Sequence, residues 1–316
     1  MQRRAQSAME YLTTYGWAIL IIAIVLGALF ELGVFSGTFF LPKVPPGSCY
    51  VYRPYGPGSP LSASLEGACN GALPQYALTL VGNSSRLKIS DMMQEEGTNP
   101  VTYSIWVKAR NFSGTYHVLF GDTYGDNNDG TNYNRNGYDV YISGNQISYL
   151  PQGYIVVERY GNQPGAVTHY TNQTVVVSLN PASLNQWYFV AVTYSKPYLK
   201  LYINGVYQGE TSGTFPITVN SRMELGAFNT TYVGGEYYFQ GAFQVSNFQA
   251  YNTSLSSNQI LFMYDEGIGG APLDLHNLVG WWPLNGNLND YSGNNHTSYS
   301  TNAVYTNSWE GGYNLP

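Results

Sequence analysis

The pattern of apolar and polar positions divides the chain into two unlike parts. Residues 6–35 form a largely apolar segment, which is almost unbroken from Trp17 to Phe30 and carries no charge and no proline there. A helix of that length, rising about 1.5 Å per residue, reaches across a hydrocarbon layer of roughly 30 Å. From residue 76 onward the pattern changes to short alternating segments, which predict β-strands. We therefore expect one long apolar helix followed by a β-rich domain.

The expected strands follow one another closely and are rich in β-branched and aromatic residues. They cover residues 76–81, 101–109, 115–122, 138–143, 154–160, 174–179, 186–194, 198–203, 222–228 and 237–252. Asn204-Gly205 is the signal of a tight hairpin, and serine and glycine at its ends predict a short helix from Ser256 to Glu266. Many short strands with glycine and asparagine turns predict a mainly β fold, an antiparallel β-sandwich or jelly roll.

Composition favours an exported protein and argues against nucleic acid as a partner. Only 10% of the 316 residues are charged, while tyrosine (30) and glycine (35) are abundant and the net charge is −6. Phosphate binding needs a basic patch, and none is present. Arg3 and Arg4 precede the apolar run and no basic cluster follows it, which predicts a single-pass membrane precursor with an extracellular C-terminal domain at the cell surface.

Residues 36–75 are predicted to form a hinge and a loop, because Pro42, Pro45 and Pro46 and the neighbouring glycines prevent the helix from continuing. The only two cysteines of the chain, Cys49 and Cys69, bracket this loop. Outside the cell such a pair is expected to form a disulfide, which stabilises by about 3 kcal/mol in the chain-entropy model. Free thiols or a metal-binding pair are the alternatives, and no histidine lies nearby to support a metal.

The residues before the apolar run carry a first family resemblance. Residues 3–12 read RRAQSAMEYL, a basic leader, a glutamine and a glutamate directly before the helix. This segment resembles the class III signal peptide of archaeal type IV pilin-like proteins, although Ala8 stands where that family usually has serine. The resemblance implies a leader of residues 1–5, removed between Ala5 and Gln6 by a prepilin-type peptidase. An ordinary signal peptide or a permanent single-pass anchor is the alternative interpretation.

The same resemblance implies an assembly role for residues 6–35, as a transmembrane helix in the precursor and as the core of a filament afterwards. Glu10 would neutralise the new amino terminus of a neighbouring subunit within the apolar bundle. Repeating one such head-to-tail contact gives an open helical filament, a homo-oligomer.

A second resemblance covers most of residues 76–270. The segments YSIWVKA, YLKLYINGVYQGE and YFQGAFQVSNFQAYNTSLSSNQILFMY resemble a laminin-G-like domain of the concanavalin A-like lectin superfamily. Residues 278–296 resemble the segment that usually opens such a domain, yet here they come last. We therefore expect a permuted sandwich spanning residues 76–316, and the resemblance implies glycans as its ligands.

Two kinds of binding residue stand out near residue 125. The loop at residues 121–130 is dense in oxygen ligands, and calcium takes six to eight of them, so Asp122, Asp126 and Asp129 are candidate ligands. Such residues are also ordinary turn formers. Asp290 is a weaker calcium candidate. Candidate sugar-stacking rings flank the acidic loop: Tyr124, Tyr133 and Tyr138.

No catalytic residue is predicted. A glucanase on this fold would need two nearby carboxylates, and the late strand at residues 243–248 contains none. The four histidines are scattered, without a nucleophile motif beside them. Candidate N-glycosylation sequons all follow the apolar run: Asn83, Asn111, Asn172, Asn229, Asn252 and Asn295.

The sequence therefore predicts a pilin-like surface filament subunit that displays a lectin-like domain for adhesion or surface coating. A monomeric, membrane-anchored carbohydrate-binding protein is the alternative, and an exported glycan-active enzyme is a third interpretation.

Overall fold

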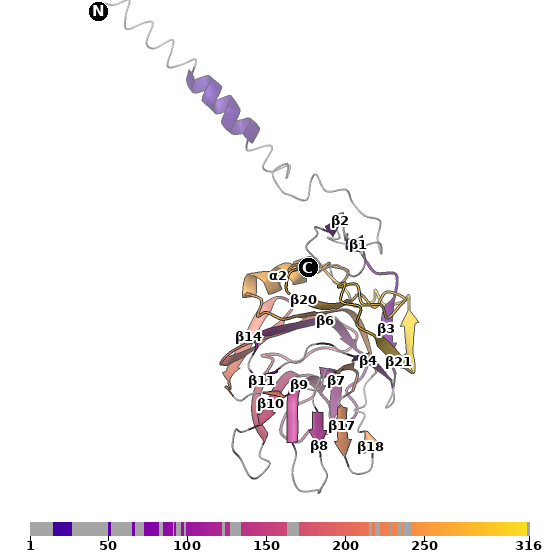
Figure 1. Ribbon diagram of the computed structural model, residues 1–316. Coiled ribbons are helices and arrows are strands. Elements are labelled where there is room, and N and C mark those ends of the chain that lie inside the picture. Colours follow the sequence, from indigo (N-terminus) through magenta and orange to yellow (C-terminus); the bar gives the residue numbers. More distant parts are fainter. Residues whose placement is uncertain are drawn as a thin grey trace, which may run out of the picture. The chain divides into compact units, whose positions relative to one another are not determined.

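The computed structural model consists of two compact units, Met1–Lys43 and Val44–Pro316, each described here by itself (Figure 1). The residues that the structure describes are 15–26, 50–51, 65–66, 73–81, 85–90, 92, 96–97, 99–121, 124–126, 134–162, 171–214, 217–218, 222–227, 229–232, 235–236 and 242–314.

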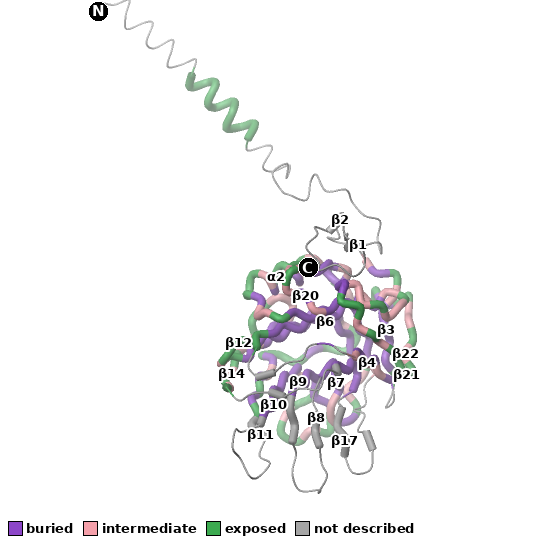
Figure 2. The backbone as a smooth tube through the Cα atoms, viewed as in Figure 1, coloured by how far each residue is buried: buried purple, intermediate pink, exposed green. Residues whose placement is uncertain are grey.

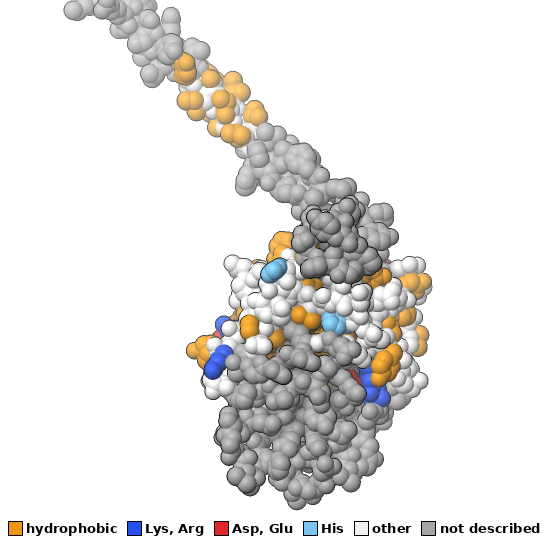
Figure 3. Space-filling view, viewed as in Figure 1, with side chains coloured by type: hydrophobic (Ala, Val, Ile, Leu, Met, Phe, Trp, Pro, Cys, Tyr) orange, Lys and Arg blue, Asp and Glu red, His pale blue; other side chains and the backbone are white. Residues whose placement is uncertain are grey.

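A helix over residues 15–26 represents the predicted apolar helix, whose remaining residues lie outside the described part. Its side chains are exposed on every side, for example Trp17 at 65% and Ile24 at 62% (Figures 2 and 3). Among the described residues, no helix has both the length and the apolar character needed to cross a membrane. A helix that is apolar all round is normally buried among other helices or in lipid.

The second unit is built on two large β-sheets. Every pairing in sheet I is antiparallel, and the order of its first seven strands is β14, β13, β12, β6, β19, β3 and β22, with β20 also paired to β19. Their bounds are β14 (Val206–Ser212), β13 (Tyr198–Ile203), β12 (Trp187–Ser195), β6 (Val101–Ala109), β19 (Phe243–Tyr251), β3 (Ala77–Leu80), β22 (Ala303–Thr306) and β20 (Leu278–Trp282).

Sheet II has ten strands, and all but the β17–β8 pairing are antiparallel. Its order is β18 (Gly235–Glu236), β17 (Asn229–Tyr232), β8 (Tyr124–Asp126), β9 (Asn134–Ser143), β7 (Tyr116–Gly121), β16 (Arg222–Leu225), β4 (Arg86–Ser90) and β21 (Ser298–Thr301); β10 (Ile155–Asn162) pairs with β9, and β11 (Thr171–Val177) pairs with β10. Two short pairs are separate from both sheets: β1 (Tyr50–Val51) with β2 (Leu65–Glu66), and β15 (Ile217–Thr218) with β5 (Glu96–Gly97).

The core lies between the two sheets, because alternate residues of each strand point inward. In β6 the inward residues include Ile105 and Val107, and in β9 they include Val140 and Ile142, all at most 1% exposed. Arg159 of β10 is buried within this core, with its guanidinium carbon 4.1 Å from the ring centroid of Tyr194. The mainly β sandwich that the sequence predicts is confirmed.

The outer face of sheet I is covered by α2 (Ser257–Asp265) and by the C-terminal segment. Helix α2 begins with a capping box between Ser256 and Gln259, as its sequence predicts. Its Ile260 and Met263 pack on a cluster that includes Trp106, so the aromatic residues of this outer face are buried too.

Residues 278–306 contribute strands to both sheets. Strand β20 pairs with β19 and β22 pairs with β3 in sheet I, while β21 pairs with β4 in sheet II. The C-terminal segment therefore belongs to both sheets of the sandwich.

Candidate functional site

One row of residues crosses the outer face of sheet II. The register aligns one residue from each of six strands: Lys88, Glu224, Gly121, Asp139, Glu158 and Val175. Residues directly opposite on neighbouring strands have Cβ atoms about 4.5–5.5 Å apart, so Asp139 and Glu158 are close neighbours, whereas Gly121 separates Asp139 from Glu224. Asp139 and Glu224 are 1% exposed and Glu158 is 8% exposed. The three acids of the row are therefore buried, whereas Val175 at its β11 end is exposed.

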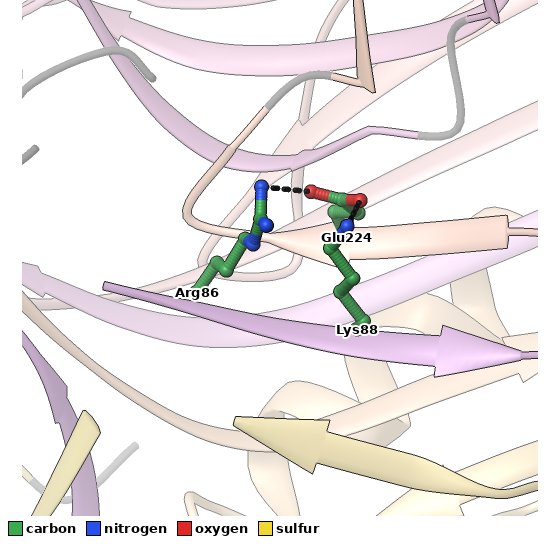
Figure 4. Close-up of polar contacts among 3 residues, drawn as sticks. All are labelled: Arg86, Lys88 and Glu224. Atoms are coloured by element: carbon green, nitrogen blue, oxygen red, sulfur yellow. Dashed lines mark ion pairs between the residues drawn. The ribbon is translucent and has the colours of Figure 1, made fainter. Parts of the chain in front are cut away.

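The β16 end of the row is held by ion pairs. Glu224 Oε1 lies 3.2 Å from Lys88 Nζ, and its Oε2 lies 3.9 Å from Arg86 Nη1 (Figure 4). Both cations come from β4, the strand next to β16. A buried carboxylate needs such partners, so Glu224 joins two strands and is not an available acid.

Glu158 is held differently, by tyrosine hydroxyls. Tyr141 donates to Glu158 Oε1 at 3.0 Å, Tyr160 donates to Oε2, and Gln173 donates to the Tyr160 hydroxyl at 3.2 Å. Burial raises the pKa of Tyr141, and the neighbouring Glu158 raises it further, so this phenol keeps its proton and remains a donor. Both carboxylate oxygens are thus occupied, and the carboxylate is fixed.

Two further tyrosines extend this arrangement to the surface. The Tyr116 ring packs edge-on against Tyr141, with centroids 5.0 Å apart, and its hydroxyl lies 3.2 Å from that of Tyr149. Tyr149 is 68% exposed. We call the following six residues the tyrosine–glutamate cluster: Tyr116, Tyr141, Tyr149, Glu158, Tyr160 and Gln173.

The loop that carries Tyr149 is fixed to neighbouring backbone. Asn145 accepts a hydrogen bond from Gly114 N at 3.1 Å through Oδ1, and its own N–H donates to Phe112 O at 2.8 Å. A Cβ at Gly144 would lie 2.2 Å from Gly114 O, so this position requires glycine. Ile147 and Leu150 pack on the cluster formed by Val118, Tyr141 and Val156. The exposed Tyr149 is therefore presented from a well-packed loop.

The structure corrects one sequence-based expectation for sugar binding. Tyr138 is 1% exposed because it belongs to the inward set of β9, and its ring centroid lies 5.8 Å from that of Tyr103 in the core. It therefore cannot serve as a stacking platform. Tyr133 lies outside the described residues, and Tyr124 lies in β8, whose side chains are not described.

The candidate calcium ligands of the acidic loop are not placed. Asp122 and Asp129 lie outside the described residues, and Asp126 is described only as a backbone position of β8. Within the described residues, no group of three or more His, Cys, Asp or Glu side chains could hold a metal ion. Asp290 has a structural role instead, since it accepts hydrogen bonds from Trp281 N, Ser292 N and His296 N at 2.8–3.1 Å.

The remaining predicted site residues fall partly outside and partly within the described part of the chain. The assembly and disulfide residues lie outside the described part: Ala5, Gln6, Glu10, Cys49 and Cys69. Among the sequons, Asn83 lies outside it and the side chains of Asn172 and Asn229 are not described, whereas Asn111 is half-buried and Asn252 and Asn295 are exposed.

Sequence reasoning missed the tyrosine–glutamate cluster. One signal was available: Asp139 and Glu158 each interrupt a strand of apolar and aromatic residues, which is typical of an acid on an outer face. Their meeting depends on the β9–β10 register, which no local pattern specifies.

The two packed sheets, antiparallel except for the β17–β8 pairing, form a β-sandwich. The family model of the concanavalin A-like lectin/glucanases superfamily matches residues 81–261, more than half of the chain. The chain belongs to this superfamily. No curated protein sequence matches the chain.

Solved structures with a similar fold come from varied sources. A proposed carbohydrate binding protein from Bacteroides ovatus is 16% identical, with a TM-score of 0.49 over 74% of this chain and 61% of that one. The chain thus spans about three fifths of that protein's length. A heptameric SAP-like pentraxin from Limulus polyphemus is 13% identical, with a TM-score of 0.46 over 73% of this chain and 94% of that one. The botulinum neurotoxin serotype G binding domain is 12% identical, with a TM-score of 0.38 over 60% of this chain and 46% of that one.

Proposed function

We propose that the protein is a carbohydrate-binding surface protein whose ligand contacts the outer face of sheet II at the tyrosine–glutamate cluster. The observation that carries this proposal is the exposed Tyr149, hydrogen-bonded to Tyr116 and carried by a loop that hydrogen bonds hold to neighbouring backbone. Tyrosine combines an apolar ring face with a polar edge, which suits a sugar ring with its hydroxyls. Gln173 and Val175 add exposed polar and apolar surface on the neighbouring strand β11.

Binding without hydrolysis is part of the proposal. Glycoside cleavage requires one carboxyl group that gives a proton and another that acts as base or nucleophile. Both oxygens of Glu158 accept hydrogen bonds from tyrosine hydroxyls, and Glu224 forms ion pairs with Lys88 and Arg86. Both carboxylates are therefore engaged by other side chains of this domain. No cofactor is proposed apart from calcium at Asp122, Asp126 and Asp129.

A glycan array tests this site. Tyr149→Ala should lower affinity on the order of tenfold, equivalent to about 1.4 kcal/mol, because it removes the exposed ring and the partner of Tyr116. Tyr198→Ala is the matched control, since Tyr198 is 45% exposed and belongs to sheet I. Equal effects of both substitutions would place the ligand elsewhere, and release of reducing ends from a bound polysaccharide would contradict the non-enzymatic assignment. Repeating the array without calcium tests the acidic loop.

The filament role is the finer part of the proposal. Support comes from the segment RRAQSAMEYL and from the helix over residues 15–26, which exposes apolar side chains in every direction. Processing between Ala5 and Gln6 would release this helix to pack with those of neighbouring subunits, and the lectin-like domain would then be displayed for adhesion or as a coat.

A permanently membrane-anchored, monomeric carbohydrate-binding protein is the second candidate, favoured by the same apolar helix. Intact mass of the protein recovered from the cell surface separates the two. A mass beginning at Gln6 supports the pilin-like precursor, whereas retention of Met1 supports the anchor.

A further inference from the structure

Two of the sequons lie on either side of the first residues of β20. Asn252 directly follows β19, and its backbone N–H donates to Asn277 O at 3.0 Å. Asn294, the neighbour of Asn295, donates from Nδ2 to Leu278 O at 3.2 Å. The segments around Asn252 and Asn294 thus bond to two consecutive residues, Asn277 and Leu278. The two sequons therefore lie in the same region of the sandwich.

Both acceptor amides are available at this place. The side chains of Asn252 and Asn295 are both exposed. The backbone around Asn295 is fixed, because His296 N donates to Asp290 at 3.0 Å and Ser90 N donates to Thr297 O at 2.9 Å. Asn295 has a φ of 58°, so it lies in a tight turn. Thr297 is itself exposed.

The third sequon with a described side chain differs from these two. Asn111 is half-buried, and its Oδ1 accepts a hydrogen bond from Ser113 Oγ at 3.4 Å. The side chain of Asn111 is therefore less exposed than those of Asn252 and Asn295, although this hydrogen bond leaves its Nδ2 unengaged.

We infer that Asn252 and Asn295 are modified with N-linked oligosaccharides and that Asn111 is not. The donor is a lipid-linked oligosaccharide phosphate. Nδ2 forms the bond to the anomeric carbon, the bond from that carbon to the lipid phosphate oxygen breaks, and the amide loses one proton to a base of the transferase. This inference rests on the extracellular location in the proposed function.

The positions of the two sequons also separate the attached sugars from the proposed binding face. Asn252 directly follows β19 of sheet I, and Asn295 lies in the connection from β20 to β21, an edge strand of sheet II that β4 and β16 separate from β7. The tyrosine–glutamate cluster lies on the outer face of sheet II. Loss of both oligosaccharides should therefore leave the glycan-array profile unchanged.

Glycopeptide mapping and intact mass of the protein from its producing cells test the inference. Ser254→Ala and Thr297→Ala each remove a sequon without touching the acceptor, which avoids placing another residue at the positive φ of Asn295. Each substitution should remove the mass of one oligosaccharide. Ser113→Ala is the matched control and should leave the mass unchanged.

The outcomes distinguish this inference from the proposed function. If protease added to intact cells releases the domain and Asn252 and Asn295 are unmodified, the inference is wrong while the surface location stands. Modification at Asn111 in place of these two would also overturn it. If the domain is protected from protease and carries no sugar, the surface location itself fails, and the inference fails with it.

Discussion

Single buried polar residues make stability depend on pH. His117 of β7 is 1% exposed and lies edge-on to Phe112, with ring centroids 6.1 Å apart. Burial lowers the pKa of His117 from its ordinary value of 6.5, because the interior disfavours the imidazolium. As pH falls below 6.5, the unfolded chain binds a proton that the folded chain does not, so the free energy of unfolding decreases.

The free energy of unfolding, measured with urea at pH 8, 6 and 5, should therefore be highest at pH 8 and should decrease below pH 6.5. His117→Leu should reduce this decline. His276→Gln, at an exposed position, should retain it. An unchanged slope in His117→Leu would show that other groups cause the decline.

The sequence identifies a residue's position correctly when the pattern that sets this position is local. Trp106 and Trp187 stand in apolar strands, a local pattern that indicates the core, and both are buried. Tyr138 was misplaced, although its period-two spacing from Val140 and Ile142 already puts it on the inward side of β9. Glu158 meets Tyr141 only through the pairing of β9 with β10, so that contact required the structure.

At the scale of elements, the C-terminal segment is fastened onto sheet I by one buried lysine. Lys108 of β6 donates from Nζ to Trp309 O at 2.6 Å and to Gly311 O at 2.7 Å. Trp309 in turn donates from its indole to Pro74 O at 3.0 Å, and Trp187 N donates to Gly312 O at 2.9 Å. One cation thus supports the contact between the two ends of the described sandwich.

Lys108→Met keeps most of the side-chain volume but removes these donors. We expect the free energy of unfolding to fall by about 1–3 kcal/mol, since hydrogen bonds from charged groups are being lost and Gly311 O is left without this donor. Hydrogen exchange should also accelerate at Trp187 N and around Trp309. The exposed pair of Lys200 and Glu210 supplies a control, because Lys200→Met should cost less than about 0.5 kcal/mol. Equal losses in the two variants would contradict the fastening role.

The sequence predicted the helices and strands more completely than the contacts between them. The helix at 256–266 was recognisable from its cap, and the strands from their alternation, because both signals are local. The last predicted strand, residues 237–252, appears as β19 over Phe243–Tyr251 with a bulge between Ser246 and Gln249, where Asn247 has a φ of 52°. Within that bulge Asn247 accepts from the Trp281 indole at 2.8 Å, a contact with β20 that no local pattern specifies.

At the scale of the whole molecule, the chain combines a charge-poor sandwich with an apolar segment that needs partners. The sandwich buries its own apolar faces, between the sheets and beneath α2. The helix over residues 15–26 remains exposed on all sides within its own unit. A helix with apolar side chains on every side is normally covered by lipid or by other helices. In the proposed function the domain would supply the binding surface, and the helix would supply the means of anchoring or assembly.

The pilin-like and anchored interpretations differ in what they require of Glu10. In a filament its carboxylate would lie in an apolar bundle, where an unanswered charge costs several kcal/mol and a formed pair roughly breaks even. Glu10→Gln keeps the shape but removes the attraction to a neighbour's amino terminus. We expect filament yield to fall sharply, while membrane insertion and folding of the lectin-like domain are retained. Electron microscopy of cells carrying the variant, together with a blot of the membrane fraction, measures both. Unchanged filaments would mean that this pairing does not drive assembly, and loss of the protein from the membrane would assign Glu10 to export.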